Sequence, residues 1–311
     1  MLNKRSRIPL LIIFRFAYSS LTQTSSSLQM WSLLPFTFIA VAATTCLTAI
    51  VGQATTCPCG WVNNFPKQST NVIGGDDVSD HEYPFLATVY KKLSWKKEPI
   101  CGATIITSSN VITAAHCVDD ISSYFVLVGV TDLSKAGPSD FIAVSDIETA
   151  VGFDKSTNLN DIAILTLSVP LDFSTRNIGP VCIPSFGIKQ NELPNVVRIL
   201  GWSKAAHKLS GRLQKVDSHV VNIKDCSAEY PHLNEEKQFC TYDTGKGPIK
   251  GDSGGPALWW DPEIMGYTLV GIVSMGPEEE SSIPIIHTFV PFNPYLKFIN
   301  AQSSGEVCRK V

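Results

Sequence analysis

The sequence predicts an all-β protein. Its 311 residues include 19 Pro and 21 Gly, spread along the chain, a pattern that fits many short strands and turns better than long helices. No internal repeat or heptad pattern is present. Hydrophobic residues make up 44% and charged residues 17%, so the chain can bury a core and is not disordered as a whole. The net charge of −3 offers no basic excess, which excludes nucleic acid as an expected partner.

Residues 1–54 are expected to be a leader outside the folded core. Residues 33–51 carry no charge and precede Gly52-Gln53-Ala54, the pattern of a secretory signal with a small-residue cleavage site. Met30 would begin a signal peptide by itself and is an alternative start. The same uncharged run could also span a bilayer, so a membrane anchor is the competing interpretation. The small residues after the run favour cleavage, and we predict a secreted, extracellular protein.

Cysteine usage fits an oxidising compartment. The chain has nine Cys, and loss of the leader removes Cys46, which leaves an even set of eight. In a secreted chain such a set predicts a disulfide framework rather than a metal site. No HExxH and no paired CxxC motif is present, and Cys57-Pro-Cys59 is too tight for a typical zinc half-site. We expect no metal.

Three separated segments carry residues that can do chemistry. In the segment from Gly251 to Pro256, glycines enclose Ser253 and permit a ligand to approach inward-pointing backbone N–H groups. The end of an apolar run places His116 beside a cysteine. Asp161 precedes an apolar strand, where an ionised carboxylate is costly unless it is paired. Taken singly, these segments would be a glycine-rich turn, a structural histidine and a turn aspartate.

In the order His116, Asp161, Ser253, the three segments together resemble the trypsin and chymotrypsin family of serine proteases. The resemblance extends from Val72 to about Asn300. It implies two packed antiparallel six-stranded Greek-key β-barrels with the active site between them. It also implies a short C-terminal helix from about Asn293 to Asn300.

The resemblance assigns a catalytic role to each of these residues. His116 would take the proton of Ser253 as general base and return it to the leaving amine as general acid. Asp161 would orient His116 and stabilise its imidazolium form. The backbone N–H groups of Gly251 and Ser253 would form the oxyanion hole. Peptide bonds of protein or peptide substrates would be hydrolysed through an acyl-enzyme on Ser253, with no cofactor, by a protein expected to be a monomer.

The resemblance also implies most disulfide pairings. The family pattern joins Cys101 to Cys117, Cys226 to Cys240, and Cys182 to a cysteine before the protease domain, for which we choose Cys59. Cys57 and Cys308 remain, and we pair them only because they are the two cysteines left over.

Residues 55–71 are expected to be a pro-segment and residues 72–311 the protease domain. Zymogens of this family are cut before an Ile-Val-Gly-Gly-like segment, which here begins at Val72, and the freed amine would pair with Asp252. The residue before the cut is usually Arg or Lys, but here it is Asn71. Two interpretations stay open: an activating protease that cuts after Asn71, or a protein that remains in its precursor form.

The predicted substrate pocket departs from that of trypsin. Trypsin-like members carry Asp six residues before the nucleophile, where this chain has Gly247, so cleavage after basic residues is disfavoured. Ile285 stands where a glycine usually lines the pocket wall, and its side chain would shorten the pocket. We therefore expect a small residue before the scissile bond.

Two more departures concern the rim of the pocket. Ser274, Met275 and Gly276 match the substrate-binding strand, with Met275 in place of the usual tryptophan. The family's bridge between the pocket walls would need cysteines near Ile249 and Glu279, and neither residue is one. A re-tuned pocket and a pocket no longer used are both consistent with these changes.

The sequence thus supports two functions. The first is a secreted serine endopeptidase with an activating protease and serpin-type inhibitors as further expected partners. The alternative is a protease-like binding or regulatory protein with little turnover, suggested by Asn71 and Ile285. The intact set of three catalytic residues favours the enzyme. The opening Cys57 to Trp61 also resembles the linker before the protease domain of secreted insect proteases, including those of venom and saliva.

Overall fold

The computed structural model describes residues 55–64, 76–94, 96–119, 123–204, 208–244, 251–277 and 283–310. The predicted leader, the expected cleavage site at Asn71 and Val72, and Gly247 at the predicted pocket base lie outside these ranges. In the ranges that are described, no helix is long and apolar enough to cross a membrane.

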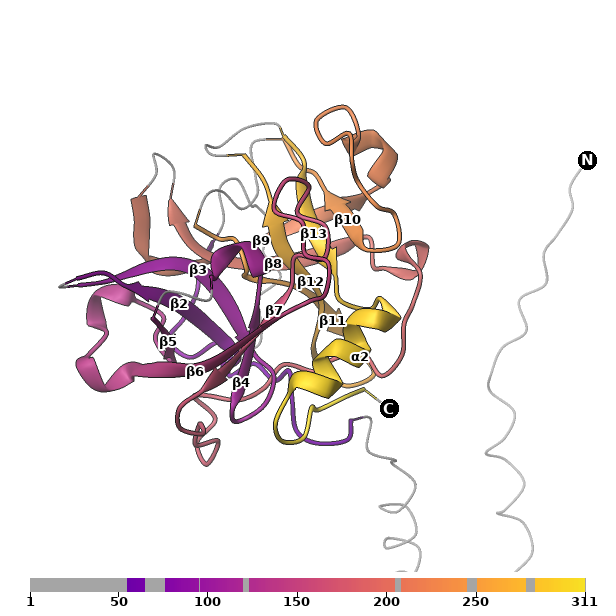
Figure 1. The fold of residues 1–311 in the computed structure, drawn as a ribbon. Helices are drawn as coiled ribbons and strands as arrows, with labels where there is room; N and C mark the ends of the chain where they lie inside the picture. The colour runs from indigo at the N-terminus through magenta and orange to yellow at the C-terminus, as the bar shows by residue number, and fades with distance from the viewer. Residues whose placement is uncertain are drawn as a thin grey trace, which may run out of the picture. The chain divides into compact units, whose positions relative to one another are not determined.

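Strands dominate the described part of the chain (Figure 1). The strands are β1 (Asp76–Asp77), β2 (Leu86–Lys92), β3 (Lys97–Ile105), β4 (Asn110–Thr113), β5 (Tyr124–Val128), β6 (Phe141–Thr149), β7 (Ala163–Leu167), β8 (Val196–Lys204), β9 (Lys208–Val221), β10 (Gln238–Thr241), β11 (Pro256–Asp261), β12 (Gly266–Met275) and β13 (Ile285–Phe289). The helices are the α-helix α2 (Asn293–Gln302) and the short 3-10 helices η1 (Ala115–Cys117), η2 (Leu133–Lys135), η3 (Pro138–Asp140), η4 (Gln190–Glu192) and η5 (Ile223–Cys226).

The first half of the fold is a closed antiparallel barrel with strand order β2-β3-β4-β7-β6-β5. β-Branched and other apolar residues fill its interior. Between β4 and β7, Val111 pairs with Leu165 and Ile112 with Ile164, and none of the four side chains is more than 1% exposed. Closure leaves no free strand edge, so these buried backbone groups find partners within the barrel.

The second half closes in the same way. The order β9-β10-β13-β12-β11-β8 returns to β9 through the β8–β9 hairpin, and β1 adds to the outside of β9. Val197, Ile199, Phe239 and Val273 belong to its buried core. The predicted pair of six-stranded antiparallel barrels is therefore confirmed. The predicted C-terminal helix is confirmed too, and it begins at Asn293 as expected and ends two residues later, at Gln302.

The segment from Thr55 to Asn64 is part of the folded unit. Disulfides join Cys57 to Cys308 and Cys59 to Cys182. The backbone of Gly60 donates to Pro180 O at 2.8 Å and accepts from Tyr267 N at 2.7 Å. This segment thus contacts the connection between the barrels, strand β12 and the C-terminal tail at once.

Candidate active site

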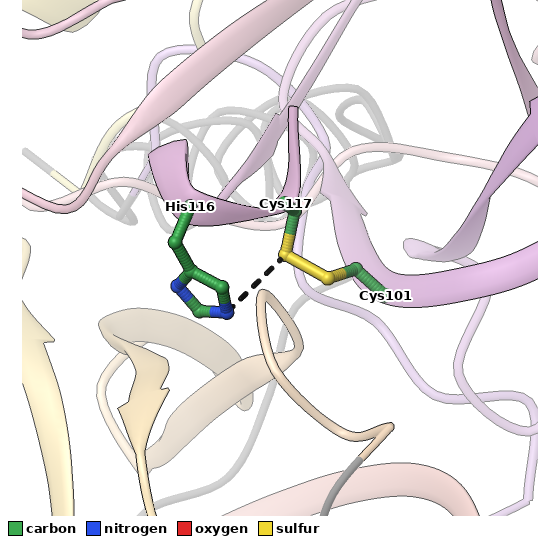
Figure 2. A group of neighbouring side chains, drawn as sticks. All are labelled: Cys101, His116 and Cys117. Atoms are coloured by element: carbon green, nitrogen blue, oxygen red, sulfur yellow. Dashed lines mark hydrogen bonds between the residues drawn. A yellow bond between two sulfur atoms is a disulfide. The ribbon is translucent and has the colours of Figure 1, made fainter. Parts of the chain in front are cut away.

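His116 lies in η1, directly after β4 on the first barrel. A disulfide from Cys117 to Cys101 on β3 ties this turn to the neighbouring strand, as Figure 2 shows. Ala115, on the other side of His116, is fully buried, whereas the imidazole is 23% exposed. The turn is therefore held by its two neighbours, and the histidine ring remains accessible.

Asp161 is fully buried and is paired with His116 at two points. Its Oδ1 accepts from the backbone N of His116 at 2.8 Å, and its Oδ2 lies 2.7 Å from His116 Nδ1. Oδ2 also accepts from Ser274 Oγ at 2.6 Å. A buried carboxylate is tolerated only with such compensation. The contact at Nδ1 directs Nε2 of the ring away from Asp161, as a base that serves another residue requires.

Two further side chains from the second half of the chain hold the segment around Asp161. Thr288 Oγ1 on β13 donates to Asp161 O at 2.8 Å, and Tyr295 OH on α2 donates to Asn160 Oδ1 at 3.1 Å. Burial, together with the negative charge of Asp161, raises the pKa of Tyr295, so its hydroxyl stays protonated and can donate. The first barrel therefore supplies Asp161, and the second barrel and α2 orient it.

Ser253 lies in the glycine-rich turn before β11. Gly251 and Gly254 have φ values of 108° and 77°, in the region that favours glycine. The backbone O of Ser253 accepts from Gly102 N at 2.8 Å, and Gly254 N donates to Val273 O at 2.8 Å. The turn is thus bonded both to β3 of the first barrel and to β12 of the second.

The close packing of this turn explains the need for Gly254. A Cβ there would lie 2.2 Å from Thr113 Oγ1, two residues before η1 begins. Gly102, which bonds Ser253, is in turn the neighbour of Cys101, whose disulfide partner adjoins His116. These links bring Ser253 to the same junction as His116 and Asp161.

The histidine and the serine do not form a hydrogen bond here. In the part of the chain that the structure describes, Ser253 Oγ has no bond to His116 Nε2, which lies 3.7 Å from Cys117 Sγ (Figure 2). Catalytic hydrogen bonds are often long without substrate and tighten when it binds.

Asp252, next to the serine, points toward the second barrel. It is 5% exposed, and a Cβ on Gly201 would lie 2.0 Å from its Oδ1, so the carboxylate packs directly on the Gly201 backbone. Its expected activation partner, the amine of Val72, lies outside the described residues.

Of the predicted pocket residues that the structure describes, Ser274 and Met275 lie on β12, Gly276 directly follows that strand, and Ile285 begins β13. Ser274 is 3% exposed and bonds Asp161, whereas Met275 is half-buried and Gly276 is exposed. Ile285 is 3% exposed and packs in the same apolar cluster as Val273. The predicted pocket wall on β13 is therefore apolar at Ile285.

His287 lies two residues further along β13 and was not among the predicted site residues. It is fully buried, stacks on Phe239 with 4.7 Å between ring centroids, and its Nε2 lies 2.9 Å from Thr241 Oγ1. Burial lowers its pKa to about 3, so the ring is neutral. The sequence signal that could have indicated a buried histidine is its position inside the five-residue strand Ile285–Phe289, all of which is buried.

One group among the described side chains has metal-like spacing, formed by Cys101, His116 and Cys117. The two cysteines form a disulfide, so neither offers a thiolate to an ion. This group is a bridge beside a histidine and does not have the donors of a metal centre.

The structure pairs all eight cysteines of the described residues. In addition to the three bridges described above, Cys226 is bonded to Cys240, and this bridge joins η5 to β10 of the second barrel. Three of the pairings are those that the family resemblance implied, and the fourth joins the two cysteines that were left over, Cys57 and Cys308.

A buried aspartate bonded to a histidine, on a fold of two closed six-stranded barrels that also carries a glycine-enclosed serine, is the pattern of the double-barrel class of serine peptidases. Residues 72–299 match the family model described as Trypsin. The chain belongs to the trypsin family and is a serine-type endopeptidase.

Similar proteins come from several arthropods. A protein named Venom serine protease from Polistes dominula is 29% identical over 260 residues, which cover 80% of this chain and 90% of that protein. Venom serine protease 34 from Apis mellifera is 30% identical over 239 residues, which cover 73% of this chain and 57% of that protein. The Clotting factor G beta subunit of Tachypleus tridentatus is 30% identical over 228 residues, which cover 67% of this chain and 72% of that protein.

Proposed function

We propose that this endopeptidase is a secreted zymogen that is activated by a cut after Asn71 and then hydrolyses peptide bonds through an acyl-enzyme on Ser253. The single observation that carries the catalytic part is the buried Asp161, bonded to both the backbone N and Nδ1 of His116. Asp161 keeps Nδ1 protonated, and His116 Nε2 then accepts the proton of the Ser253 hydroxyl.

The oxyanion hole of the proposal consists of the backbone N–H groups of Gly251 and Ser253. The left-handed conformation of Gly251 supports this assignment, because a side chain at this φ would be strained. After acylation, the same N–H groups would stabilise the oxyanion that forms when water attacks the ester. His116 would act as base in that second step and return the proton to Ser253.

For specificity, we propose a small residue before the scissile bond. The buried Ile285 supports this, since its branched side chain stands on the wall where the family usually has glycine. Gly247 in place of an aspartate removes the charge that would pair with Lys or Arg. Cleavage after alanine or valine is therefore expected to exceed cleavage after arginine.

Secretion is supported by the four disulfides, which form and persist in oxidising compartments, and by the names of the similar venom and clotting proteins. The expected partners of a secreted monomer of this kind are protein substrates, an activating protease and serpin-type inhibitors.

The test is the intact mass of the secreted full chain before and after treatment with an asparagine-specific endopeptidase and then a fluorophosphonate. A chain cut before Val72 that gains one adduct supports the proposal, and Ser253→Ala must abolish the adduct. A cut chain that stays unlabelled would overturn it and favour the protease-like binding protein. Peptides with alanine, valine, phenylalanine or arginine before the scissile bond then test the predicted preference.

A further inference from the structure

The residue before Asp161 has an unusual backbone conformation. Asn160 has a φ of 58°, in the left-handed region that is costly for most residues and that asparagine tolerates better. Its backbone O accepts from Ile162 N at 2.9 Å, which makes Asp161 the central residue of a three-residue turn. In so tight a turn, the direction of the Asp161 side chain depends directly on the conformation of Asn160.

The side chain of Asn160 is bonded at both ends of its amide. Its Nδ2 donates to Gly152 O at 2.8 Å, and its Oδ1 accepts from Tyr295 OH at 3.1 Å. The two bonds fix the orientation of the amide, because the reversed amide would set its oxygen against the carbonyl oxygen of Gly152. Asn160 is only half-buried, so filling the core does not account for its position.

Tyr295, which holds Asn160, belongs to an element outside the first barrel. It lies on α2, which follows the last strand of the second barrel (Figure 1). Tyr295 is 3% exposed, and Leu296 and Ile299 of the same helix pack in the core cluster that contains Ile162. The hydroxyl of a buried tyrosine needs a hydrogen-bond partner, and Asn160 Oδ1 is that partner.

The chain after α2 also contacts the first barrel. Ser304, two residues after the helix, donates from its backbone N and its Oγ to Asn110 Oδ1, at 2.8 Å and 3.0 Å. Asn110 is fully buried and begins β4, the strand that leads to His116. The C-terminal part of the chain is therefore bonded both to the segment before Asp161 and to the strand before His116.

We propose that Asn160 is a positioning residue of the active site, held by Gly152 and Tyr295, and that the C-terminal helix thereby sets the direction of the Asp161 carboxylate toward His116. This inference rests on the proposed function, because Asp161 belongs to that same site. Asn160 acts through Asp161 and not on the substrate. Its loss should therefore lower kcat and leave KM nearly unchanged.

The kinetic test compares Asn160→Ala with a matched control, Asn158→Ala. Asn158 is also left-handed, with a φ of 50°. Within the described ranges it accepts from Gln238 Nε2 through its backbone O, at 3.4 Å, and its side chain forms no hydrogen bond. Both changes remove an asparagine that tolerates this conformation, so they share that cost, but only Asn160→Ala removes the two side-chain bonds.

Both processed enzymes are titrated with a fluorophosphonate and assayed on a peptide with alanine before the scissile bond. Asn160→Ala should lower kcat about tenfold with KM within about twofold, whereas the control should keep kcat within about twofold of the wild type. Asn160→Gly adopts the left-handed conformation without strain but lacks the amide, so it should retain the loss of kcat. Wild-type kcat in either Asn160 variant would overturn the positioning role.

Tyr295→Phe tests the link to α2, since it removes only the hydroxyl. We expect kcat to fall about fivefold, the effect of one neutral hydrogen bond, and to fall no further when the change is added to Asn160→Ala. Tyr83→Phe is the control, because Tyr83 is 4% exposed and its hydroxyl accepts from Arg198 Nη1 at 3.2 Å. Fully additive losses of kcat in the double variant would contradict the link.

Proton NMR separates this inference from the proposed function, since it needs no activity. In a Ser253→Ala background, the proton between His116 Nδ1 and Asp161 Oδ2, atoms 2.7 Å apart, gives a low-field signal that reports the geometry of this bond. The signal should shift or broaden in Asn160→Ala and in Tyr295→Phe, and it should not change in the two control variants.

A signal that is unchanged in both Asn160→Ala and Tyr295→Phe would overturn the positioning role, whatever the enzyme does. If the wild type takes no fluorophosphonate but the signal moves as expected, the proposed chemistry fails and the positioning role stands. Because Tyr295→Phe keeps the packing of α2, it provides the result even if Asn160→Ala does not fold.

Discussion

At the scale of single residues, the buried charge of Asp161 imposes the strongest chemical requirement in the site. A fully buried carboxylate would be protonated or displaced without donors, and here His116, through two nitrogens, and Ser274 provide them. The sequence indicated His116 as a partner because of the chain order of the family. It did not indicate that Ser274, expected to form part of the substrate strand, would also bond the aspartate.

Ser274→Ala removes one donor from Asp161 without disturbing its bonds to His116. A hydrogen bond to a charged group is worth about 1.5–3 kcal/mol, so we expect kcat to fall about tenfold or more. Steady-state kinetics on titrated enzyme measure the effect. Ser145→Ala serves as control, because Ser145 Oγ donates to Thr166 O on the exposed side of β6. Equal kcat values for Ser274→Ala and wild type would show that the contact does not support catalysis.

At the scale of elements, the segment from Thr55 to Asn64 behaves as a fixed part of the fold. The ring of Trp61 packs so closely on Gly179 that a Cβ there would lie 2.0 Å from the indole, and Trp61 Nε1 donates to Arg176 O at 3.2 Å. Two disulfides add covalent links to different parts of the chain. The pairing of Cys57 with Cys308 also anchors the tail that follows α2.

A cut after Asn71 should therefore leave the segment attached. Intact mass without reductant should show one two-chain species, and reduction should separate the chains. Replacing only Cys57 and Cys308 with serine, or only Cys59 and Cys182, should retain the link. Each removal should cost about 2–5 kcal/mol of unfolding free energy. Release of the segment from either double variant without reductant would contradict the pairing.

At the scale of the whole molecule, stability should depend on pH through His287. Its pKa in the folded state, about 3, is below that of an exposed histidine because burial penalises the charged ring. The unfolded chain therefore binds a proton first as the pH falls. The stability from this group is full above about pH 6.5 and is lost progressively toward pH 3, by about 1.4 kcal/mol per pH unit.

Urea unfolding of the Ser253→Ala protein at pH 7 and pH 5 measures this effect without self-digestion. We expect the free energy of unfolding to fall by about 2 kcal/mol from His287 between these two values. His287→Gln keeps a polar side chain that does not titrate, and its pH dependence should be weaker by that amount. Parallel curves for the two proteins would rule out the neutral buried histidine.

The sequence by itself determined the fold class, because scattered Gly and Pro fit short strands better than long helices. The two barrels followed from the resemblance to the trypsin and chymotrypsin family, which the motifs around His116, Asp161 and Ser253 carry. The roles of these residues, the processing site at Asn71 and the domain boundaries stay predictions.

The tertiary structure alone decided which side chains surround these residues. The segment around Asp161 is contacted by side chains 113 to 135 residues away, those of Ser274, Thr288 and Tyr295. Asp243, two residues after β10, contacts His219 on β9. Local patterns constrain residue type and strand period, but a hydrogen bond between distant residues exists only once both barrels have closed and their side chains have packed.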